Sequence, residues 1–350
     1  MLQVTEKFSL HKHNTFGFPS VAEFFCSVST EGELSEALAW AKKRKIVTTI
    51  LGDGSNVVLT GDLAGLVINI AILGVELVSQ DKDDLVIRVG AGENWHQLVL
   101  KTLEMGWNGL ENLSLIPGCV GAAPIQNIGA YGVELSERFD SLEAMHKATG
   151  DIRKMDSSDC QFGYRESVFK RAGQDDYVIT AVNLRLSTKP NICIEYSALK
   201  QSLMRLHSQL QMKHGMSFHD TLTPKMISNL VCSIRRSKLP DLKYTPNVGS
   251  FFKNPVISCE AEIALKEKNS DLVSYDLYDG SMKIAAGYLI EKAGWKGLQR
   301  SGVGVHDQQA LVLVSYGGCG KELLSLATDI QNSVMKKFGI ALEIEPRIYK

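Results

Sequence analysis

The segment Ile116–Gly132 carries residue types that can bind a flat or phosphorylated ligand through the backbone. It contains four glycines, two prolines (Pro117 and Pro124) and no charged side chain. Glycine allows close approach and positive φ, whereas proline fixes φ, so this composition is unlike that of a plain helix or strand. We expect a loop that offers N–H groups to a ligand. Tight packing of the chain on itself is the alternative.

A second stretch of small residues, Gly52–Asn56, follows the apolar run Ile46–Leu51. The apolar run is typical of a buried strand. Small residues directly after a strand often present backbone donors to a pyrophosphate. The two stretches together therefore predict a site for a phosphate-bearing ligand.

Ser250 is the first candidate for side-chain chemistry. It follows Gly249, but Phe252 takes the place of the second glycine of a nucleophile elbow, so a serine hydrolase is disfavoured. A serine held by packed aromatic side chains could instead deliver a proton. The alternative is a serine that only caps a turn.

Basic residues form two further candidates. Arg165 stands beside Tyr164 and could clamp a carboxylate through two parallel hydrogen bonds. A surface arginine in a salt bridge is the alternative. Arg235, Arg236 and Lys238 end an expected helix, where they could hold a diphosphate or simply favour the helix dipole.

Glu343 and Glu345 lie two residues apart, so on a strand both point to one face. Two acids on an apolar strand are costly when they are buried without partners, which makes one of them a candidate functional carboxylate. For His306 a hydrogen-bonded structural role is the better interpretation. The sequence shows no metal-ligand spacing.

Helical periodicity and end signals place these candidates on helices and strands. Thr30 and Glu33 form a capping-box pattern before one helix, which basic residues end at 42–45, and Thr223 and Pro224 begin another over 224–239. The further expected helices are 93–105, 283–293 and 321–338. The expected strands are 46–51, 66–70, 85–89, 138–148, 177–186, 310–315 and 342–348. The polar stretch 187–222 is typical of a domain junction with a mobile or helical excursion.

The bulk composition is that of a soluble globular protein of two or three domains. The chain has 350 residues, of which 44% are hydrophobic and 22% charged, with a formal net charge of −1. No broad basic field for nucleic acid or an anionic membrane is therefore expected. The 7 cysteines are odd in number and form no C-x-x-C pair, which indicates reduced thiols. With no apolar signal segment over residues 1–20, we expect a cytoplasmic protein.

Taken in order, eight motifs of this sequence resemble those of one family, the UDP-N-acetylenolpyruvoylglucosamine reductases (MurB family) of peptidoglycan precursor synthesis. Any one motif is weak alone, but together they run through nearly the whole chain. They are Asn14–Gly17, Leu51–Asn56, Ile116–Gly132, Tyr164–Ser167, Gly249–Pro255, Ala285–Glu291, His306–Ala310 and Glu343–Arg347.

The resemblance implies an α+β protein with two domains. An FAD-binding domain of the vanillyl-alcohol-oxidase (PCMH) type would span residues 1–215, with two subdomains that divide near residue 75 and are joined by the strand 340–350. A smaller α/β substrate-binding domain would span residues 223–339. The resemblance also implies noncovalent FAD, NADPH as hydride donor and a UDP-sugar enolpyruvyl ether as substrate. We expect a monomer.

The resemblance assigns three catalytic roles. Ser250 would protonate C2 of the enolpyruvyl group after a hydride passes from flavin N5 to C3. Arg165 and Glu345 would polarise the substrate carboxylate and stabilise the enolic intermediate, with Glu345 acting best when protonated or hydrogen-bonded. Because a serine hydroxyl is a poor acid, neighbours such as Lys253 or a bound water would have to assist Ser250.

The resemblance also assigns binding residues. Those expected to hold FAD are Gly52, Asp53, Gly54, Ser55, Asn56, Pro117, Gly118, Gly121, Ala122, Ile125 and Gly129. Those expected to hold the substrate are Tyr131, Tyr164, Tyr196, Arg235, Lys238, Asn254 and Gln308. We further expect the 187–222 segment with Tyr196 to form a mobile lid over the substrate diphosphate.

Two features depart from the family pattern. Residues 187–222 add sequence around Tyr196, and Pro346 stands where the family often has valine, which removes an N–H from that strand. A flavin-dependent alcohol oxidase of the same fold and a non-catalytic UDP-sugar-binding protein remain as alternatives. A Rossmann dehydrogenase is disfavoured because no G-x-G-x-x-G opens a helix after the first strand.

Overall fold

The structure, a computed structural model, describes the whole chain except residues 1, 172–175, 215–221 and 278. Two compact units divide the chain, and each is built from several stretches of sequence. Unit 1 comprises Met1–Phe8, Ala22–Asp53 and Ala64–Ser237. Unit 2 comprises Ser9–Val21, Gly54–Leu63 and Lys238–Lys350. In the described part of the chain, no helix is long and apolar enough to cross a membrane.

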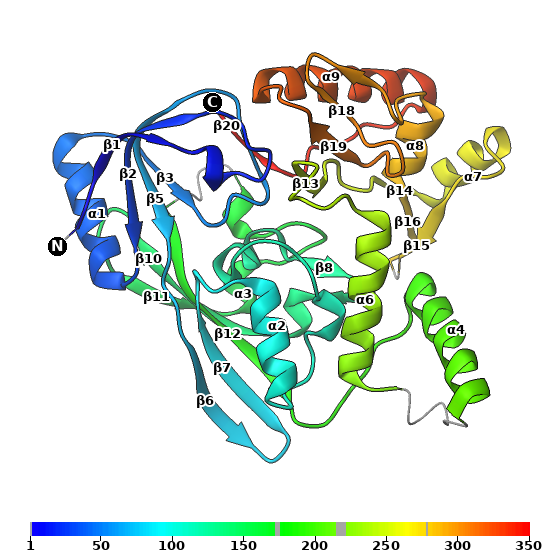
Figure 1. The fold of residues 1–350 in the computed structure, drawn as a ribbon, viewed down its shortest axis with the longest axis horizontal. Helices are drawn as coiled ribbons and strands as arrows, with labels where there is room; N and C mark the ends of the chain where they lie inside the picture. Colours follow the sequence, from blue (N-terminus) through cyan, green and yellow to red (C-terminus); the bar gives the residue numbers. More distant parts are fainter. Residues whose placement is uncertain (1, 172–175, 215–221, 278) are drawn as a thin grey trace. The chain divides into compact units, whose positions relative to one another are not determined.

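The first sheet of unit 1 has four strands in the order β1-β2-β5-β3 (Figure 1). Their bounds are Thr5–Ser9 (β1), Val21–Val28 (β2), Leu63–Ile70 (β5) and Thr48–Leu51 (β3). β3 and β5 run parallel, and both fall on strands that the sequence predicted. The small-residue loop that begins at Gly52 therefore leaves the carboxyl end of a parallel strand.

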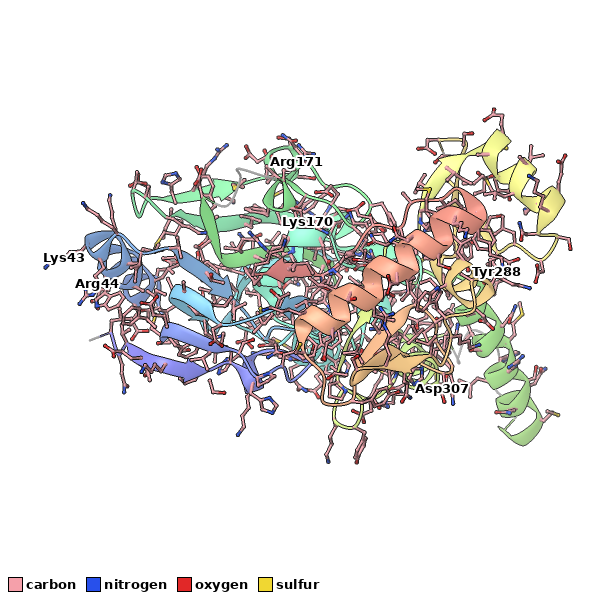
Figure 2. All side chains as sticks on the ribbon, turned by 90° about the horizontal axis from the view of Figure 1, so that it is seen from above. Lys43, Arg44, Lys170, Arg171, Tyr288 and Asp307 are labelled. Carbon is pink, nitrogen blue, oxygen red and sulfur yellow. The ribbon has the colours of Figure 1, made fainter. Side chains whose placement is uncertain are left out.

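Helix α1 (Glu31–Arg44) begins where the sequence predicted. Thr30 Oγ1 accepts the Glu33 N–H at 3.1 Å, and the Glu33 carboxylate accepts the N–H of Ser29 at 2.7 Å. The helix buries one apolar stripe, made of Leu34, Ala37, Leu38 and Ala41. Lys43 and Arg44 project from its exposed C-terminal end (Figure 2).

The second sheet of unit 1 is antiparallel, with five strands in the order β11-β10-β12-β7-β6. Their bounds are Ile152–Met155, Phe139–His146, Tyr177–Ser187, Asp84–Gly90 and Val75–Asp81. Helix α2 (Trp95–Glu104) lies near β7 and β12 (Figure 1) and buries Trp95, Leu98 and Val99. The indole Nε1 of Trp95 donates to the Leu113 carbonyl at 3.0 Å, which ties this helix to the segment before the glycine-rich loop.

The glycine-rich segment consists of short turns, as its composition predicted. The 3₁₀ turns are η2 (Glu111–Leu113), η3 (Val120–Ala122), η4 (Pro124–Gln126) and η5 (Leu135–Glu137), with a two-stranded ribbon formed by β8 (Gly129–Ala130) and β9 (Val133–Glu134). Helix α3 (Ser157–Cys160) and the turn η6 (Val168–Lys170) follow β11. No regular element longer than three residues interrupts the described backbone between α2 and β10.

Two helices complete unit 1. Helix α4 (Ser197–His214) lies inside the 187–222 stretch, so the expected helical excursion is present, whereas residues 215–221 lie outside the described chain. Helix α6 (Pro224–Lys238) begins at the expected proline. Leu199 and Leu203 of α4 share a small core with Ile227, Val231 and Ile234 of α6, and this core includes only residues of unit 1. By packing, unit 1 therefore extends through α6, beyond the domain boundary that we expected between 215 and 223.

Unit 2 holds a four-stranded sheet and a three-stranded sheet. The first has the order β13-β19-β18-β17, with bounds Asn247–Ser250, Val312–Ser315, Val303–Val305 and Gln299–Arg300. The second has the order β14-β16-β15, with bounds Val256–Ser258, Ser281–Ile284 and Ser274–Asp276. Helix α9 (Gly320–Phe338) lies over β18 (Figure 1) and buries apolar residues at helical spacing.

Three shorter helices belong to unit 2: η1 (His11–His13), α7 (Cys259–Lys268) and α8 (Ala286–Lys292). The helix that we expected over 283–293 starts later, at Ala286, because Ser281–Ile284 pair as the central strand β16. The core of this unit includes Phe16, Phe251 and Phe252.

The strand expected over 342–348 is shorter than predicted. Ile344 makes an isolated bridge to Phe252, and β20 begins only at Arg347 and ends at Tyr349. Pro346 has no N–H to donate, which interrupts the ladder between them. β20 pairs in parallel with β4 (Val57–Leu59), within the residues that we expected to form the cofactor domain, but both strands pack in unit 2.

Candidate active site

The two predicted cofactor loops touch each other in unit 1. A Cβ on Gly52 would lie 2.2 Å from Cys119 Sγ, so a larger residue there would require the Cys119 side chain to move. Asn94 donates from its side chain to the Asp53 carboxylate, while its own oxygen accepts the Gln97 N–H and caps α2. Burial raises the pKa of the Cys119 thiol, so this sulfur stays protonated and acts as a packing group.

Glycine in the longer loop also serves close packing. A Cβ on Gly121 would meet the Ala91 Cβ at 2.6 Å, and the Gly118 carbonyl accepts the Trp95 N–H at 3.0 Å. Close packing therefore accounts for a glycine at position 121. Binding is still compatible with it, because Pro117 is exposed and Ala122 and Ile125 are half-buried beside them. These apolar groups and small loops fit the flat ring and pyrophosphate of FAD.

Gly54, Ser55 and Asn56 fall in unit 2, after the chain has left β3. Gly54 has a φ of +66°, and a Cβ there would lie 2.0 Å from the His13 carbonyl oxygen. The Thr15 N–H donates to the Gly54 carbonyl at 3.1 Å, and the Arg347 N–H donates to that of Asn56 at 3.0 Å. The motif Asn14–Gly17 and the end of Leu51–Asn56 are thus neighbours.

Arg165 is held in place by its own loop. Its backbone has a φ of +54°, its Nη2 donates to the Gly129 carbonyl at 2.5 Å, and its guanidinium lies 5.3 Å from the Tyr164 ring centroid. Gly129 leaves the space that this guanidinium occupies.

Tyr131, Tyr196 and Arg235 gather in one cluster of unit 1. The two tyrosine rings meet edge to face, with centroids 5.2 Å apart. Burial lowers the pKa of Arg235, and Arg165 acts in the same direction, while Tyr131 and Cys232 oppose it. Arg235 Nε donates to the Leu115 carbonyl at 3.2 Å, away from the end of its own helix, so it is more than a helix-dipole partner. The cluster offers a half-buried positive charge and phenolic hydroxyls to an anion.

Ser250 ends strand β13 in unit 2. It is half-buried, lies opposite Val312, and is followed by the fully buried Phe251 and Phe252. Gly249 before it has a φ of +75°, and its N–H donates to Asn247 Oδ1 at 2.7 Å. Packed aromatic residues therefore do fix the backbone next to this serine, as the sequence indicated.

The segment with Glu343 and Glu345 runs beside Ser250–Lys253. The Glu345 N–H donates to the Phe251 carbonyl at 3.0 Å. Glu345 is half-buried, whereas Glu343 is exposed and pairs with the buried Lys253. The two acids thus have different surroundings, which supports Glu345 as the functional one of the pair.

The remaining expected residues have mixed surroundings. Asn254 Oδ1 accepts the Ala286 N–H at 2.9 Å and so caps helix α8, and Lys238 is exposed where α6 ends. Gln308 is exposed in a turn in which His306 Nδ1 accepts the N–H groups of Gln308 and Gln309. His306 therefore has the structural role that we favoured.

Sequence reasoning missed His96. Its Nδ1 accepts the Leu115 N–H at 3.0 Å, directly before the glycine-rich segment, and Leu115 has a φ of +60°. Leu115 is bulky for this left-handed region, so its conformation needs such support. A histidine inside a predicted amphipathic helix gives no signal for a contact 19 residues away.

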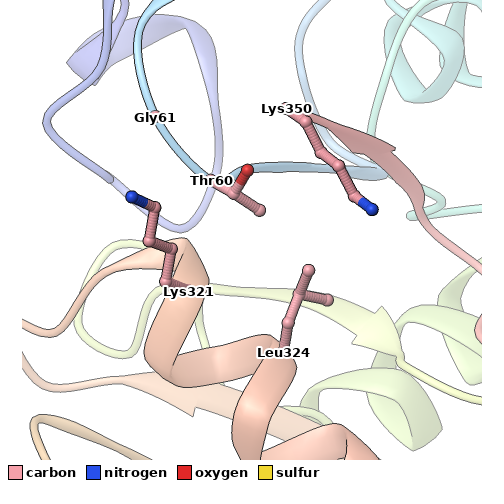
Figure 3. A pocket seen from close by; sticks show the side chains of 5 residues that line it. All are labelled: Thr60, Gly61, Lys321, Leu324 and Lys350. Carbon is pink, nitrogen blue, oxygen red and sulfur yellow. The ribbon is translucent and has the colours of Figure 1, made fainter.

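A pocket in unit 2 is lined by none of the predicted site residues. Thr60, Gly61, Lys321, Leu324 and Lys350 line it (Figure 3). Among the described residues, no group of three or more His, Cys, Asp or Glu side chains is arranged to hold a metal.

Known families match both parts of the chain. The model for an FAD binding domain matches residues 22–156, and the model for the C-terminal domain of UDP-N-acetylenolpyruvoylglucosamine reductase matches residues 240–349. The first match covers the loop at Gly52 and the loop at Gly118. The chain is therefore an FAD-binding protein with a second, C-terminal domain, which confirms the expected α+β organisation.

Full-length relatives make the assignment specific. UDP-N-acetylenolpyruvoylglucosamine reductase of Pseudomonas savastanoi pv. phaseolicola is 43% identical over 349 residues, covering 99% of each chain. That of Paraburkholderia phytofirmans is 46% identical over 341 residues, covering 97% of this chain and 96% of the relative. This chain belongs to the UDP-N-acetylenolpyruvoylglucosamine reductase family.

A solved structure agrees on the fold. UDP-N-acetylenolpyruvylglucosamine reductase (MurB) from Thermus caldophilus superimposes with a TM-score of 0.65 over 100% of this chain and 99% of its own, at 23% identity.

Proposed function

We propose that this chain reduces the enolpyruvyl ether of UDP-N-acetylglucosamine to UDP-N-acetylmuramate in peptidoglycan precursor synthesis. Its membership of the reductase family supports this activity. The structural observation that carries the proposal is the hydrogen bond from the Glu345 N–H to the Phe251 carbonyl, at 3.0 Å. This bond joins the backbones of two segments of one unit, and these segments carry a hydroxyl and a carboxyl of the kinds that the reaction needs.

The reaction adds a hydride to C3 of an alkene and a proton to C2. Bound FAD supplies the hydride chemistry, with NADPH as the source. Ser250 donates its hydroxyl proton to C2, and that proton is later restored from solvent. Arg165 attracts the negative charge that develops on the substrate carboxylate, and Glu345 stabilises the enolic form when it is protonated or hydrogen-bonded.

Lys253 was one candidate to assist Ser250. Its ammonium lies 2.5 Å from Glu343 Oε1, so part of its hydrogen-bonding capacity is committed to that carboxylate. Lys253 and a bound water molecule therefore both remain candidates to donate a proton back to the Ser250 oxygen.

The remaining assignments concern binding. Tyr131, Tyr196 and Arg235 would hold the diphosphate side of the substrate, in line with the half-buried positive charge of their cluster. Tyr164, Lys238, Asn254 and Gln308 would contact the rest of the sugar nucleotide. The cofactor residues would be those of the two loops: Gly52, Asp53, Gly54, Ser55, Asn56, Pro117, Gly118, Gly121, Ala122, Ile125 and Gly129.

FAD would bind without a covalent bond. Cys119 and Tyr131 are the two side chains of these loops that could attack a flavin ring. Burial raises the pKa of both, which disfavours the nucleophilic anion at each. A monomer in the cytoplasm completes the proposal, and all seven cysteines are free thiols, as a reducing compartment requires.

Anaerobic spectroscopy tests the function. The purified protein should show a yellow flavin band that NADPH bleaches and that the enolpyruvyl UDP-sugar restores. A flavin that NADPH does not bleach, but that an alcohol substrate bleaches and oxygen then restores, would instead establish an oxidase. Absence of flavin from a folded protein that still binds UDP-N-acetylglucosamine would establish a binding protein.

A further inference from the structure

Asn112 is a buried amide that joins two distant segments of unit 1. Its side chain, in the turn η2, donates from Nδ2 to the Tyr131 carbonyl at 2.8 Å and to the Cys193 carbonyl at 2.9 Å. The residue is 2% exposed. An amide nitrogen carries two hydrogens, so these two bonds use its full donor capacity.

The two segments carry the tyrosines of the substrate cluster. Tyr131 has a φ of +51°, and Gly132 after it has a φ of +87°. Cys193 approaches this turn closely, since its Sγ lies 3.8 Å from the Gly132 carbonyl oxygen. Tyr196, three residues after Cys193, then packs its ring edge to face against Tyr131. Asn112 thus anchors both backbones from which the paired rings extend.

The neighbours of Asn112 reach the third member of the cluster. Ser114 Oγ lies 2.8 Å from Ser228 Oγ on helix α6, and both hydroxyls are buried. The Leu115 carbonyl accepts from Arg235 Nε, about two turns further along α6 than Ser228. Residues 112–115 therefore bond to the Tyr131 turn, the Tyr196 segment and the helix that carries Arg235.

We propose that Asn112 is a positioning residue for the UDP-sugar substrate: it fixes the Tyr131–Tyr196 pair in the orientation that binds. The proposal rests on the proposed function, because it takes these tyrosines as substrate contacts. Two side chains that are already ordered lose less conformational freedom on binding, so the anchor lowers the KM for the substrate. Asn112 itself touches no reacting atom and acts through Tyr131 and Tyr196.

The test compares two buried asparagines of unit 1 in the holoenzyme. Asn112→Ser removes the anchor, and Asn108→Ser is the matched control. Asn108 Nδ2 donates to the carbonyls of Gly106, Ser187 and Thr188 at 3.1–3.2 Å, and the residue is 8% exposed. Its partners belong to a strand end and not to the tyrosine cluster.

Flavin absorbance separates the half-reactions. Asn112→Ser should raise the KM for the enolpyruvyl UDP-sugar in flavin reoxidation by about 10-fold, the effect of one or two net hydrogen bonds. Reduction by NADPH should stay within about twofold, since it does not use the sugar contacts. Asn108→Ser should lower stability by a similar amount and leave this KM unchanged.

A double-mutant cycle tests whether Asn112 acts through Tyr196 or only through the general stability of the fold. In a Tyr196→Ala background, Asn112→Ser should raise the KM by clearly less than about 10-fold, because one of the two tyrosines through which it acts is already missing. Additive effects of the two substitutions would overturn the proposal. An unchanged KM in folded Asn112→Ser, or equal damage to both half-reactions, would also overturn it.

Asn112→Asp keeps the side-chain size and replaces the donors with acceptors, so it covers the case in which Asn112→Ser does not fold. The same rise in KM is expected from it. If neither variant retains flavin and native circular dichroism while Asn108→Ser does, Asn112 serves folding as such and the proposal is wrong. Failure of the proposed function is distinct, because the wild-type flavin would then not be reoxidised by the sugar nucleotide at all.

Discussion

Lys253 and Glu343 are joined twice: the Lys253 N–H donates to the Glu343 carbonyl at 2.9 Å, and Lys253 Nζ lies 2.5 Å from Glu343 Oε1. The lysine side chain is 9% exposed and the glutamate side chain 67% exposed. The carboxylate therefore compensates a buried charge from the solvent side. This link holds the segment of Glu345 in register with that of Ser250.

Glu343→Gln should destabilise unit 2 by ~1–3 kcal/mol, because it leaves the buried ammonium without its counter-charge. Urea unfolding at neutral pH measures the change. Glu291→Gln is the control, since its pair with Lys296 at 3.0 Å is exposed on both sides and should cost no more than ~0.5 kcal/mol. Equal losses in the two variants would show that burial of Lys253 does not matter.

Ser250→Ala should separate the two half-reactions. Flavin reduction by NADPH should stay nearly intact, whereas reoxidation by the enolpyruvyl substrate should slow by at least ~10²-fold, the lower end of what a positioned general acid contributes. Stopped-flow absorbance measures both steps. Ser258→Ala, which removes only the cap of helix α7, is the control. If both steps slow together, Ser250 is structural; if neither slows, Glu345 or a water is the donor.

Tyr196→Phe keeps the ring contact with Tyr131 and removes only the hydroxyl. The KM for the sugar nucleotide should rise about 10- to 100-fold, as expected for a lost hydrogen bond to a charged group, with NADPH-dependent flavin reduction unaffected. Tyr177→Phe is the control, because Tyr177 packs on His146 in the second sheet. A Tyr196→Phe enzyme that is impaired equally in both half-reactions would contradict the substrate role and the lid that we expect here.

Gly52→Ala should weaken FAD retention, because the new Cβ would overlap Cys119 Sγ at 2.2 Å. Overpacking of this kind costs ~1–3 kcal/mol. A smaller side chain at position 119 should remove this cost. The double variant Gly52→Ala/Cys119→Ala should recover the flavin. Flavin absorbance after gel filtration measures retention, and a failure of the second substitution to rescue the first would argue against this contact.

Acid precipitation tests the noncovalent attachment separately. The flavin should stay in the supernatant when the wild-type protein is precipitated. Yellow colour that remains in the pellet would show a covalent bond, with Cys119 and Tyr131 as the first residues to substitute.

His96 should make the protein sensitive to mild acid. Burial lowers its pKa from 6.5, and the charges of Arg236 and Arg235 act in the same direction. As the pH falls, His96 is therefore protonated in the unfolded chain before it is protonated in the folded one. Its contribution to the free energy of unfolding is complete above pH 6.5 and is lost below it. His96→Asn keeps an acceptor for the Leu115 N–H without titrating there, and it should flatten the fall in urea midpoint. An unchanged pH profile would exclude His96 as a source.

His13 should make a second contribution to the loss of stability in mild acid, because burial lowers its pKa as well. His13→Asn should remove this contribution without affecting that of His96, because the two residues belong to different units.

Local signals made much of the fold predictable. Thr30 before α1 and Pro224 at the start of α6 mark helix ends through contacts within one turn, and the structure begins both helices there. The irregular course of Ile116–Gly132 likewise follows from its glycines and prolines. The roles of Arg165, Ser250 and Glu345 came from the family resemblance and remain predictions.

Nonlocal contacts were beyond the sequence. Strand β2 was missed because its apolar residues neither alternate regularly nor follow a helical spacing, as in Phe24-Phe25-Cys26. The Gly52–Cys119 contact and the two bonds of Asn112 join residues that no periodicity relates. The start of α8 was misplaced because residues 281–284 pair with β14 and β15 as a strand, which helical spacing alone does not reveal.

The parallel pairing of β20 with β4 has a consequence for synthesis of the protein. β4 leaves the ribosome after the first sixth of the chain, but Arg347–Tyr349 supply its partner only some 290 residues later. During that interval Val58 and Leu59, both buried in the native state, have no strand to cover them. Closing so long a loop is slow and entropically costly. Unit 2 should therefore be the last part of the nascent chain to mature, and the one most dependent on chaperones while translation continues.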